Sequence, residues 1–368
     1  MVDLGVQLSK IREEVDQQIA GVLDTCQFIK GPQVASFEQS LADFHKCSYA
    51  ISCANGTDAL QIALMALDLQ PGDEVIVPAF TYVATAEVIS LLHLVPVMVD
   101  VDPNDFNIDV SRLKEHISPK TKAIVPVHLY GQMSRMKEIM DIAREHDLYV
   151  IEDNAQGIGS ANQPNGQMSG TVGHIGCTSF FPSKNLGCFG DGGALTTNDE
   201  ELARKIRMIA NHGQAKKYIH DITGVNSRLD AVQAAILNVK LKHLPSYIQN
   251  RQAAAAYYDN ALGEMSQLQI PMRSSSSTHV FHQYTLKVNG EKRDALKAYL
   301  LEKGIPSMIY YPLPLYYQKA FAKYWQDEAK LDTTEDLCQR VLSLPMHTEL
   351  GEEHLSYICD SIKLFFDS

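Results

Sequence analysis

The hydrophobic positions between about residue 50 and residue 200 follow two alternating patterns. Short runs rich in β-branched residues predict strands, and stretches with apolar residues three and four apart predict helices between them. The predicted strands cover 73–80, 95–101, 121–131, 147–155, 174–181 and 193–198, and the predicted helices cover 57–69, 82–92 and 136–146. This alternation predicts an α/β fold in which helices cover both faces of a mostly parallel sheet.

Beyond residue 198 the pattern changes. Helical periodicity predicts two further helices, over 199–212 and 228–262, and the second is long enough to lead away from the large domain. A polar, turn-rich stretch then precedes a predicted strand, helix and strand, over 282–288, 293–304 and 305–313. We therefore expect a large domain over 1–245, which includes an N-terminal helical segment, and a small α+β C-terminal domain over 246–368.

The composition agrees with a globular protein of this size. The chain has 368 residues, of which 45% are hydrophobic and 21% charged, and it exceeds the ~250–300 residues at which a single core usually stops growing. The formal net charge of −12 opposes binding to nucleic acid or to an anionic membrane surface. An anionic substrate would therefore need a locally basic pocket.

The cysteines and the apolar runs indicate in which cellular compartment the protein is expected. Seven cysteines show no paired spacing that would indicate zinc or a disulfide framework, so we expect no metal site and a reducing, cytoplasmic environment. Acidic residues interrupt the apolar positions of 11–23, unlike a signal peptide, and no apolar run reaches 18 residues. We expect a protein that is neither exported nor inserted in a membrane.

Candidate chemistry begins with one lysine. Lys184 follows a predicted strand and a proline in SFFPSKNLGCFGDGG and opens a glycine-rich turn. Taken alone it could be an ordinary solvated lysine. A cofactor aldehyde held covalently on an amine, however, also needs a carboxylate for its ring nitrogen and donors for its phosphate, and the chain offers a candidate for each.

The carboxylate candidate is Asp153, at the end of an apolar strand, where ligands of open α/β sheets bind. An aspartate beside a pyridine nitrogen keeps that nitrogen protonated. The alternative is that Asp153 caps a helix after the strand. Glu152 points to the opposite face of the sheet, and Gln156 could be an exposed helix-start residue or a donor to the ring's hydroxyl.

The phosphate candidate is the start of the helix that follows Asn55. Gly56 and Thr57 lead into it, and free N–H groups at a helix N-terminus favour an anion, although many such starts bind nothing. Ser179 adds a hydroxyl five residues before Lys184. Tyr82, between a strand and a helix, could stack on a planar cofactor or be a partly buried tyrosine.

A nicotinamide-binding interpretation fails on the same glycines. Gly187, Gly190, Gly192 and Gly193 precede a predicted strand, whereas the dinucleotide fingerprint requires a helix to follow its glycines. The glycines instead allow the chain after Lys184 to turn tightly and to approach a cofactor or a neighbouring subunit.

Five motifs in fixed order, NGTDAL, FTYVATAEV, IEDNAQGIGS, SFFPSKNLGCFGDGGAL and NHGQ…GVNSRLDAVQAAIL, resemble the DegT/DnrJ/EryC1/StrS family of pyridoxal-phosphate sugar aminotransferases over nearly the whole chain. The resemblance implies the fold type I (aspartate aminotransferase-like) architecture and pyridoxal 5′-phosphate as cofactor. It also implies a homodimer whose active sites lie at the subunit interface.

Carried over by position, the resemblance implies a role for each matching residue. Lys184 holds the cofactor aldehyde, Asp153 is the partner of the pyridine nitrogen, and Gln156 contacts the phenolic oxygen. The remaining cofactor-binding positions are Gly56, Thr57 and Ser179 at the phosphate, Tyr82 as the stacking ring, and Asn226, which the partner subunit sends to the phosphate. Arg228 suits an anionic part of the substrate, and Tyr310 and Tyr311 are candidate substrate contacts. Tyr310 could equally be a strand-end aromatic that packs between the two domains. His128 and His212 are more often structural residues, and we leave both out of the catalytic set.

Within the family the chain is most similar to members that aminate UDP-2-acetamido-2-deoxy-3-oxo-D-glucuronate for bacterial surface polysaccharide, with L-glutamate as donor and 2-oxoglutarate as product. Those members typically have His-Tyr-Pro where this chain has Tyr310-Tyr311-Pro312. A dTDP-3-keto-6-deoxyhexose or a 4-keto nucleotide sugar is therefore an alternative substrate. Two alternatives of another kind are a catalytically silent regulatory protein that binds the cofactor and a β-eliminating enzyme on the same fold.

Overall fold

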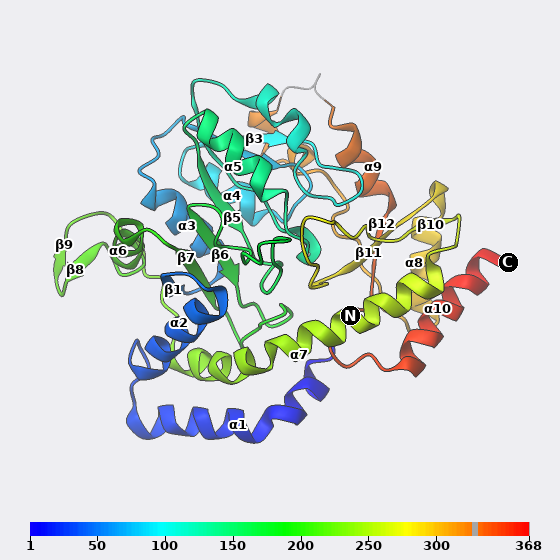
Figure 1. Ribbon diagram of the computed structural model, residues 1–368, viewed down its shortest axis with the longest axis horizontal. Helices are drawn as coiled ribbons and strands as arrows, with labels where there is room; N and C mark the ends of the chain where they lie inside the picture. Colours follow the sequence, from blue (N-terminus) through cyan, green and yellow to red (C-terminus); the bar gives the residue numbers. More distant parts are fainter. Residues whose placement is uncertain (326–329, 368) are drawn as a thin grey trace.

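The computed structural model describes residues 1–325 and 330–367 and is built around a seven-stranded sheet (Figure 1). In spatial order the strands are β1 (Tyr49–Cys53), β7 (Gly193–Thr197), β6 (Ile175–Ser179), β5 (Tyr149–Asp153), β4 (Thr121–Ile124), β2 (Glu74–Pro78) and β3 (Val95–Val99). The five strands from β6 to β3 are parallel, and β7 runs antiparallel to both of its neighbours. The predicted mostly parallel sheet is confirmed.

Alternate residues of the strands pack into different cores, as the strand period requires. Val75 and Val77 join the core formed with α3 (Gly56–Ala66), α4 (Ala84–Leu91) and α6 (Glu200–Ile209), whereas Ile76 joins the core formed with α5 (Met136–Glu145). Toward β1, α2 (Pro32–His45) and the start of α7 (Ala231–Leu262) pack against the sheet. Helices therefore cover both faces, as predicted.

The C-terminal part forms a second, smaller sheet. Its antiparallel strands are β10 (Leu268–Gln269), β11 (Tyr284–Val288) and β12 (Val341–Leu344), and it packs with α8 (Arg293–Glu302) and α10 (Glu352–Asp367). Helix α9 (Asp332–Arg340) leads into β12. The smaller elements are η1 (Val110–His116), η2 (Leu129–Gly131), the hairpin β8 (Gln214–Lys216) and β9 (Ile219–His220), η3 (Gly290–Lys292), η4 (Leu315–Tyr317) and η5 (Ala322–Tyr324).

The predicted strand over 305–313 is wrong. This segment makes one isolated bridge, between Met308 and Ser343, and β12 is the strand that pairs with β11 along its length. Pro306 and Pro312 lack the N–H groups that a ladder needs. The apolar run instead brings Tyr310 and Tyr311 to a cavity beside the large sheet.

Helix α7 connects the two parts of the molecule, and α1 (Leu4–Thr25) packs along it (Figure 1). The predicted boundary at 245/246 falls inside α7, which continues through Pro245. Several residues beyond that boundary, including Leu315, Tyr316, Phe321 and Leu331, pack into the core of the large sheet. The division into two domains stays a prediction, and residues 326–329 and 368 of the predicted small domain lie outside the described residues. Among the described helices, none is long and apolar enough to cross a membrane.

Candidate active site

A cavity of about 610 Å³ lies at the carboxyl ends of the parallel strands, where α/β sheets bind ligands. Residues that follow β1, β2, β4 and β5 line it, together with the last residue of β6, the start of α3 and the segment around 310. Nine of the predicted site residues line this one cavity: Gly56, Thr57, Tyr82, Asp153, Gln156, Ser179, Lys184, Tyr310 and Tyr311.

Lys184 reaches the cavity from a tight turn after β6. Its backbone N–H donates to the carbonyl of Phe181 at 2.8 Å. A Cβ on Gly187 would lie 2.4 Å from the carbonyl oxygen of Pro182, so the turn can close only with glycine at that position. Burial lowers the pKa of Lys184 to about 8, although the charge of Asp153 opposes that shift. A substantial fraction of its amine is therefore neutral near physiological pH, as a nucleophile or base requires.

Asp153 is the last residue of β5 and is buried at the floor of the cavity. Thr85 Oγ1 donates to its Oδ2 at 2.7 Å, and the Ala155 N–H donates to its Oδ1 at 3.2 Å. No helix starts at Asp153, so the alternative of a helix cap is wrong. Burial raises the pKa of Asp153, while these hydrogen bonds and the charge of Lys184 act in the opposite direction. A cation in the cavity would stabilise its ionised form.

Gln156 connects the floor of the cavity to its wall. Its Oε1 accepts a hydrogen bond from the Tyr130 N–H at 2.7 Å, and its Nε2 donates to the Tyr311 hydroxyl at 3.3 Å. Both contacts hold the amide facing the cavity. The hydroxyl of Tyr130 in turn donates to the carbonyl of Tyr310, which links the wall to the segment around residue 310.

The start of α3 closes another side of the cavity. The side chain of Asn55 caps the helix by accepting from the Asp58 N–H at 2.8 Å, which leaves the first N–H groups free for a ligand. A Cβ on Gly56 would lie 2.6 Å from Cβ of Ser179, so only glycine lets the helix approach the end of β6 this closely. The Ser179 hydroxyl and the helix N-terminus thus form one cradle suited to a phosphate.

Tyr82 stands over the cavity with 57% of its surface exposed. Its ring centroid lies 6.3 Å from that of Tyr311, with the two planes tilted by 42°. An exposed ring of this kind offers a face to a planar ligand.

Asn226 and Arg228 are not in this cavity. Asn226 is exposed and forms an isolated bridge with Asn211, and Arg228 lines a separate cavity of about 220 Å³ beside Lys30 and Arg207. The prediction assigns Asn226 to the cavity of a partner subunit. The position of Asn226 outside the cavity of its own chain therefore does not test that assignment.

The sequence analysis missed several residues that line or support the cavity, among them Thr85, Tyr130 and His282. Thr85 lies within FTYVATAEV, one of the quoted motifs, and could have been proposed as a partner for a carboxylate. Tyr130 and His282, which line the cavity, lie far apart in the sequence and carry no local signal. His212 is exposed outside the cavity, and His128 is buried behind Asp153.

Comparison with known proteins identifies the family of this chain. The model of the DegT/DnrJ/EryC1/StrS aminotransferase family matches residues 9–363, and the chain belongs to this family. It is 46% identical over 363 residues to a UDP-N-acetyl-3-dehydro-α-D-glucosamine 3-aminotransferase of Acidithiobacillus ferrooxidans, covering 99% of this chain and 96% of the relative. It is also 46% identical over 361 residues to the UDP-2-acetamido-2-deoxy-3-oxo-D-glucuronate aminotransferase of Pseudomonas aeruginosa, covering 98% of each chain.

The fold is shared with a solved structure that contains a bound cofactor. NtdA of Bacillus subtilis, crystallised with the bound cofactor PMP, superposes with a TM-score of 0.91 at 34% identity, over 98% of this chain and 82% of NtdA. The predicted fold type I architecture and the predicted class of pyridoxal-phosphate-dependent sugar aminotransferase are confirmed.

Proposed function

We propose that the protein transfers the amino group of L-glutamate to the 3-keto group of UDP-2-acetamido-2-deoxy-3-oxo-D-glucuronate, in the cytoplasm, for bacterial surface polysaccharide (O-antigen) biosynthesis. The observation that carries the proposal is the convergence of Lys184, Asp153, Gln156 and the start of α3 on a single cavity. The names of the two relatives at 46% identity support a 3-keto UDP-sugar as acceptor.

The residues present fit pyridoxal phosphate. The cradle between Gly56 and Ser179, which a Cβ would fill, would hold the phosphate, and Asp153 would pair with the ring nitrogen. Gln156 would contact the phenolic oxygen, Tyr82 would stack on the ring, and the amine of Lys184 would hold the aldehyde. When bound, the cofactor supplies an electron-withdrawing ring and carries the amino group between donor and acceptor.

Lys184 moves the proton in both halves of the reaction. With a pKa of about 8, its Nζ can accept a proton from the α-carbon of glutamate and later return a proton to the sugar carbon that gains the amino group. Asp153, held by Thr85, would pair with the ring nitrogen through its negative charge and would keep that nitrogen protonated. The K184A variant should therefore abolish turnover.

The negative charges of the substrate require more cationic side chains than one subunit supplies to the cavity. Of the described residues that line the cavity, Lys184 alone carries an amine or a guanidinium. We therefore propose a homodimer in which a second copy supplies Asn226 to the phosphate and Arg228 to an anionic part of the substrate. Tyr310 and Tyr311 line the cavity as candidate substrate contacts.

A substrate panel tests the proposal. Purified protein, glutamate and keto sugars would be mixed, and the amino sugar and 2-oxoglutarate would be measured by mass spectrometry. The panel holds the 3-keto UDP-uronate, its counterpart with a C6 alcohol, a dTDP-3-keto-6-deoxyhexose and a 4-keto UDP-sugar. We expect the 3-keto UDP-uronate to give the highest kcat/KM. Faster turnover of the dTDP-sugar or of the 4-keto sugar would show that the proposed acceptor is wrong. The comparison between the uronate and its counterpart with a C6 alcohol is the most informative, because the Tyr310-Tyr311-Pro312 segment differs from the His-Tyr-Pro that uronate-specific relatives typically have.

A further inference from the structure

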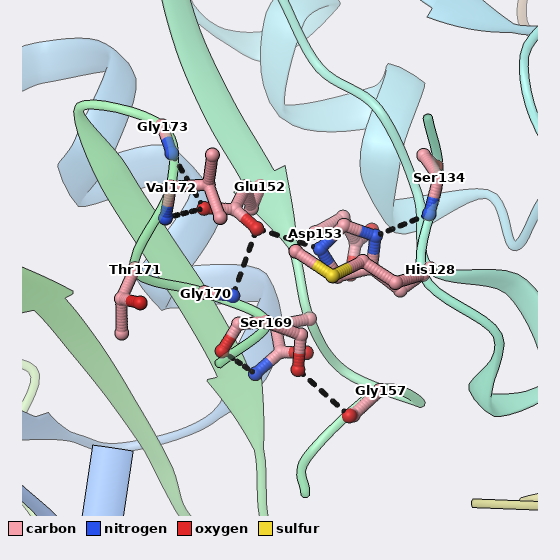
Figure 2. Close-up of polar contacts among 12 residues, drawn as sticks. His128, Ser134, Glu152, Asp153, Gly157, Ser169, Gly170, Thr171, Val172 and Gly173 are labelled. Carbon is pink, nitrogen blue, oxygen red and sulfur yellow. Dashed lines mark hydrogen bonds and ion pairs between the residues drawn. The ribbon is translucent and has the colours of Figure 1, made fainter. Parts of the chain in front are cut away.

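Behind Asp153, on the opposite face of β5, lies a carboxylate in the protein interior (Figure 2). The side chains of Glu152 and His128 are both fully buried, and Glu152 Oε2 lies 2.7 Å from His128 Nε2. Neither group reaches the cavity. A buried carboxylate of this kind is costly unless its hydrogen bonds are satisfied.

Glu152 accepts four hydrogen bonds. Its Oε1 accepts from the N–H groups of Val172 and Gly173, both at 2.7 Å, and its Oε2 accepts from the Gly170 N–H at 2.8 Å and from His128. All four partners are donors, and hydrogen bonds of this kind favour the ionised form of a carboxylate. Glu152 is therefore a charged anchor that fixes the turn 170–173 against β5.

His128 has a single tautomer in this arrangement. The Ser134 N–H, which can only donate, points at His128 Nδ1 at 3.2 Å, so Nδ1 carries no proton. The proton must then lie on Nε2, where it is donated to Glu152. Figure 2 shows the ring held between these two partners.

The same histidine also holds the backbone of Asp153. The backbone N–H of His128 donates to the carbonyl of Asp153 at 3.0 Å, and the backbone N–H of Asp153 donates to the carbonyl of Pro126 at 2.9 Å. Adjacent residues of a strand point to opposite faces. Fixing Glu152 on one face therefore sets the direction in which Asp153 leaves the other face, toward Thr85 and the cavity.

We propose that His128 and Glu152 are positioning residues for Asp153: the neutral His128, with its proton on Nε2, ties the Glu152 anchor to the backbone of Asp153 and so aims the Asp153 carboxylate into the cavity. The proposal rests on the assignment of Asp153 to the cofactor site. Neither residue touches the substrate or the cofactor, and both act through Asp153.

Two substitutions at one position test the tie. In H128Q the amide Nε2 reaches the place of the ring Nε2 and keeps a donor for Glu152, whereas in H128N the amide replaces only the Nδ1 side of the ring. We expect H128N to raise the Kd for pyridoxal 5′-phosphate, titrated by absorbance into cofactor-depleted protein, by about 10-fold or more. Its kcat should fall by about 10- to 100-fold with the KM for glutamate nearly unchanged. H128Q should stay within about 3-fold of the wild type on both measures.

A purely structural role predicts something else. If the role were purely structural, urea unfolding of the cofactor-depleted proteins would show a lower stability for H128N. The H128N molecules that remain folded would then have the Kd and kcat of the wild type. That result would overturn the proposal. The surface pair of His146 and Glu145, 3.9 Å apart, provides the matched control, and H146N should leave Kd and kcat unchanged. If H128N yields no folded protein, E152Q replaces it, because its amide puts an NH2 group, which can only donate, where an oxygen accepted from existing donors, and it should give the same losses.

The tautomer has its own measurement. Nitrogen-15 NMR of the histidine rings should find the His128 proton on Nε2, with and without cofactor. A ring protonated on Nδ1, or on both nitrogens, would contradict the tie. A wild-type protein that binds pyridoxal phosphate but transfers no amino group would contradict the proposed function alone, since the affinities of H128N and H128Q still decide the role of the pair.

Discussion

At the residue scale, the amine of Lys184 determines both the chemistry and part of the stability. Its pKa of about 8 in the folded protein lies below the ordinary lysine value of 10.5. Between these two pH values the unfolded chain binds more protons at this position than the folded chain does. The free energy of unfolding therefore rises with pH between these two values. Below about pH 8 the folded protein bears the full destabilising effect of the buried lysine charge.

This cost predicts a stabilising substitution. In the cofactor-depleted protein, K184M should raise the free energy of unfolding at pH 7 by up to about 3 kcal/mol, because it removes a poorly solvated charge. The gain should shrink as the pH approaches 10. Urea unfolding at pH 7 and pH 9.5 measures it, and an equal gain at both values would mean that the amine is not held with a lowered pKa.

A second prediction concerns Gly56. A Cβ there would lie 2.6 Å from Cβ of Ser179, so G56A should push α3 away from β6, weaken pyridoxal phosphate binding by about 10-fold or more and cost about 1–3 kcal/mol of stability. G21A is the control, since a Cβ on Gly21 of α1 meets nothing within 4 Å and should be neutral or stabilising. Fluorescence titration with the cofactor and thermal unfolding would compare the two variants, and G56A behaving like G21A would refute the cradle.

Most of the cavity was predictable from the sequence because its residues lie in short motifs at the ends of strands. Lys184, Asp153 and Gly56 are each next to a strong local signal: a glycine-rich turn, an apolar strand end and a helix start. Thr85 and Tyr130 were missed because their partners, Asp153 and Gln156, are distant in the sequence. Only the folded chain brings those pairs together.

At the element scale, a buried guanidinium of α7 binds two segments that lie further along the chain. Arg251 Nη1 donates to the carbonyls of Phe281, His282 and Met346, at 3.0, 3.4 and 3.1 Å. Burial lowers the pKa of Arg251 to about 10, which still leaves it charged at neutral pH. Three carbonyls from two segments therefore depend on a single donor.

Removing that donor should loosen both segments. We expect R251Q to cost about 3 kcal/mol of unfolding free energy, because the carbonyls lose a charged partner in the interior. Hydrogen exchange should rise around residues 281–282 and 346. R12Q is the control, since the Arg12 side chain is 61% exposed in a surface pair with Asp16 and should change stability by less than about 0.5 kcal/mol. Unchanged exchange in R251Q would show that other contacts hold these segments.

The elements themselves were predicted unevenly. Strands and helices between residues 73 and 198 have clear periodicity, and the structure confirms them. The strand β1 was not predicted, because it runs directly into the motif that opens α3. The apolar run over 305–313 was mistaken for a strand. Periodicity cannot reveal that β11 pairs instead with β12, which lies about 55 residues further along the chain.

At the scale of the whole molecule, the proposed homodimer makes a quantitative prediction. Subunits carrying K184A and subunits carrying R228A should each be inactive or nearly so. When they are mixed, refolded together and assayed, each mixed dimer would hold one complete cavity, so activity should return to about a quarter of the wild type. No recovery, from proteins shown by sedimentation to exchange subunits, would mean that Arg228 serves its own chain's cavity or none.

The path of α7 has one more consequence. The helix runs unbroken from the packing beneath the large sheet to the side chains of Ala254, Tyr258 and Leu262, which are buried against the smaller one. A polypeptide that stopped at residue 245 would strip the smaller sheet of that cover, and one that began at residue 246 would start with a severed helix. Neither half should therefore survive expression as a separate piece.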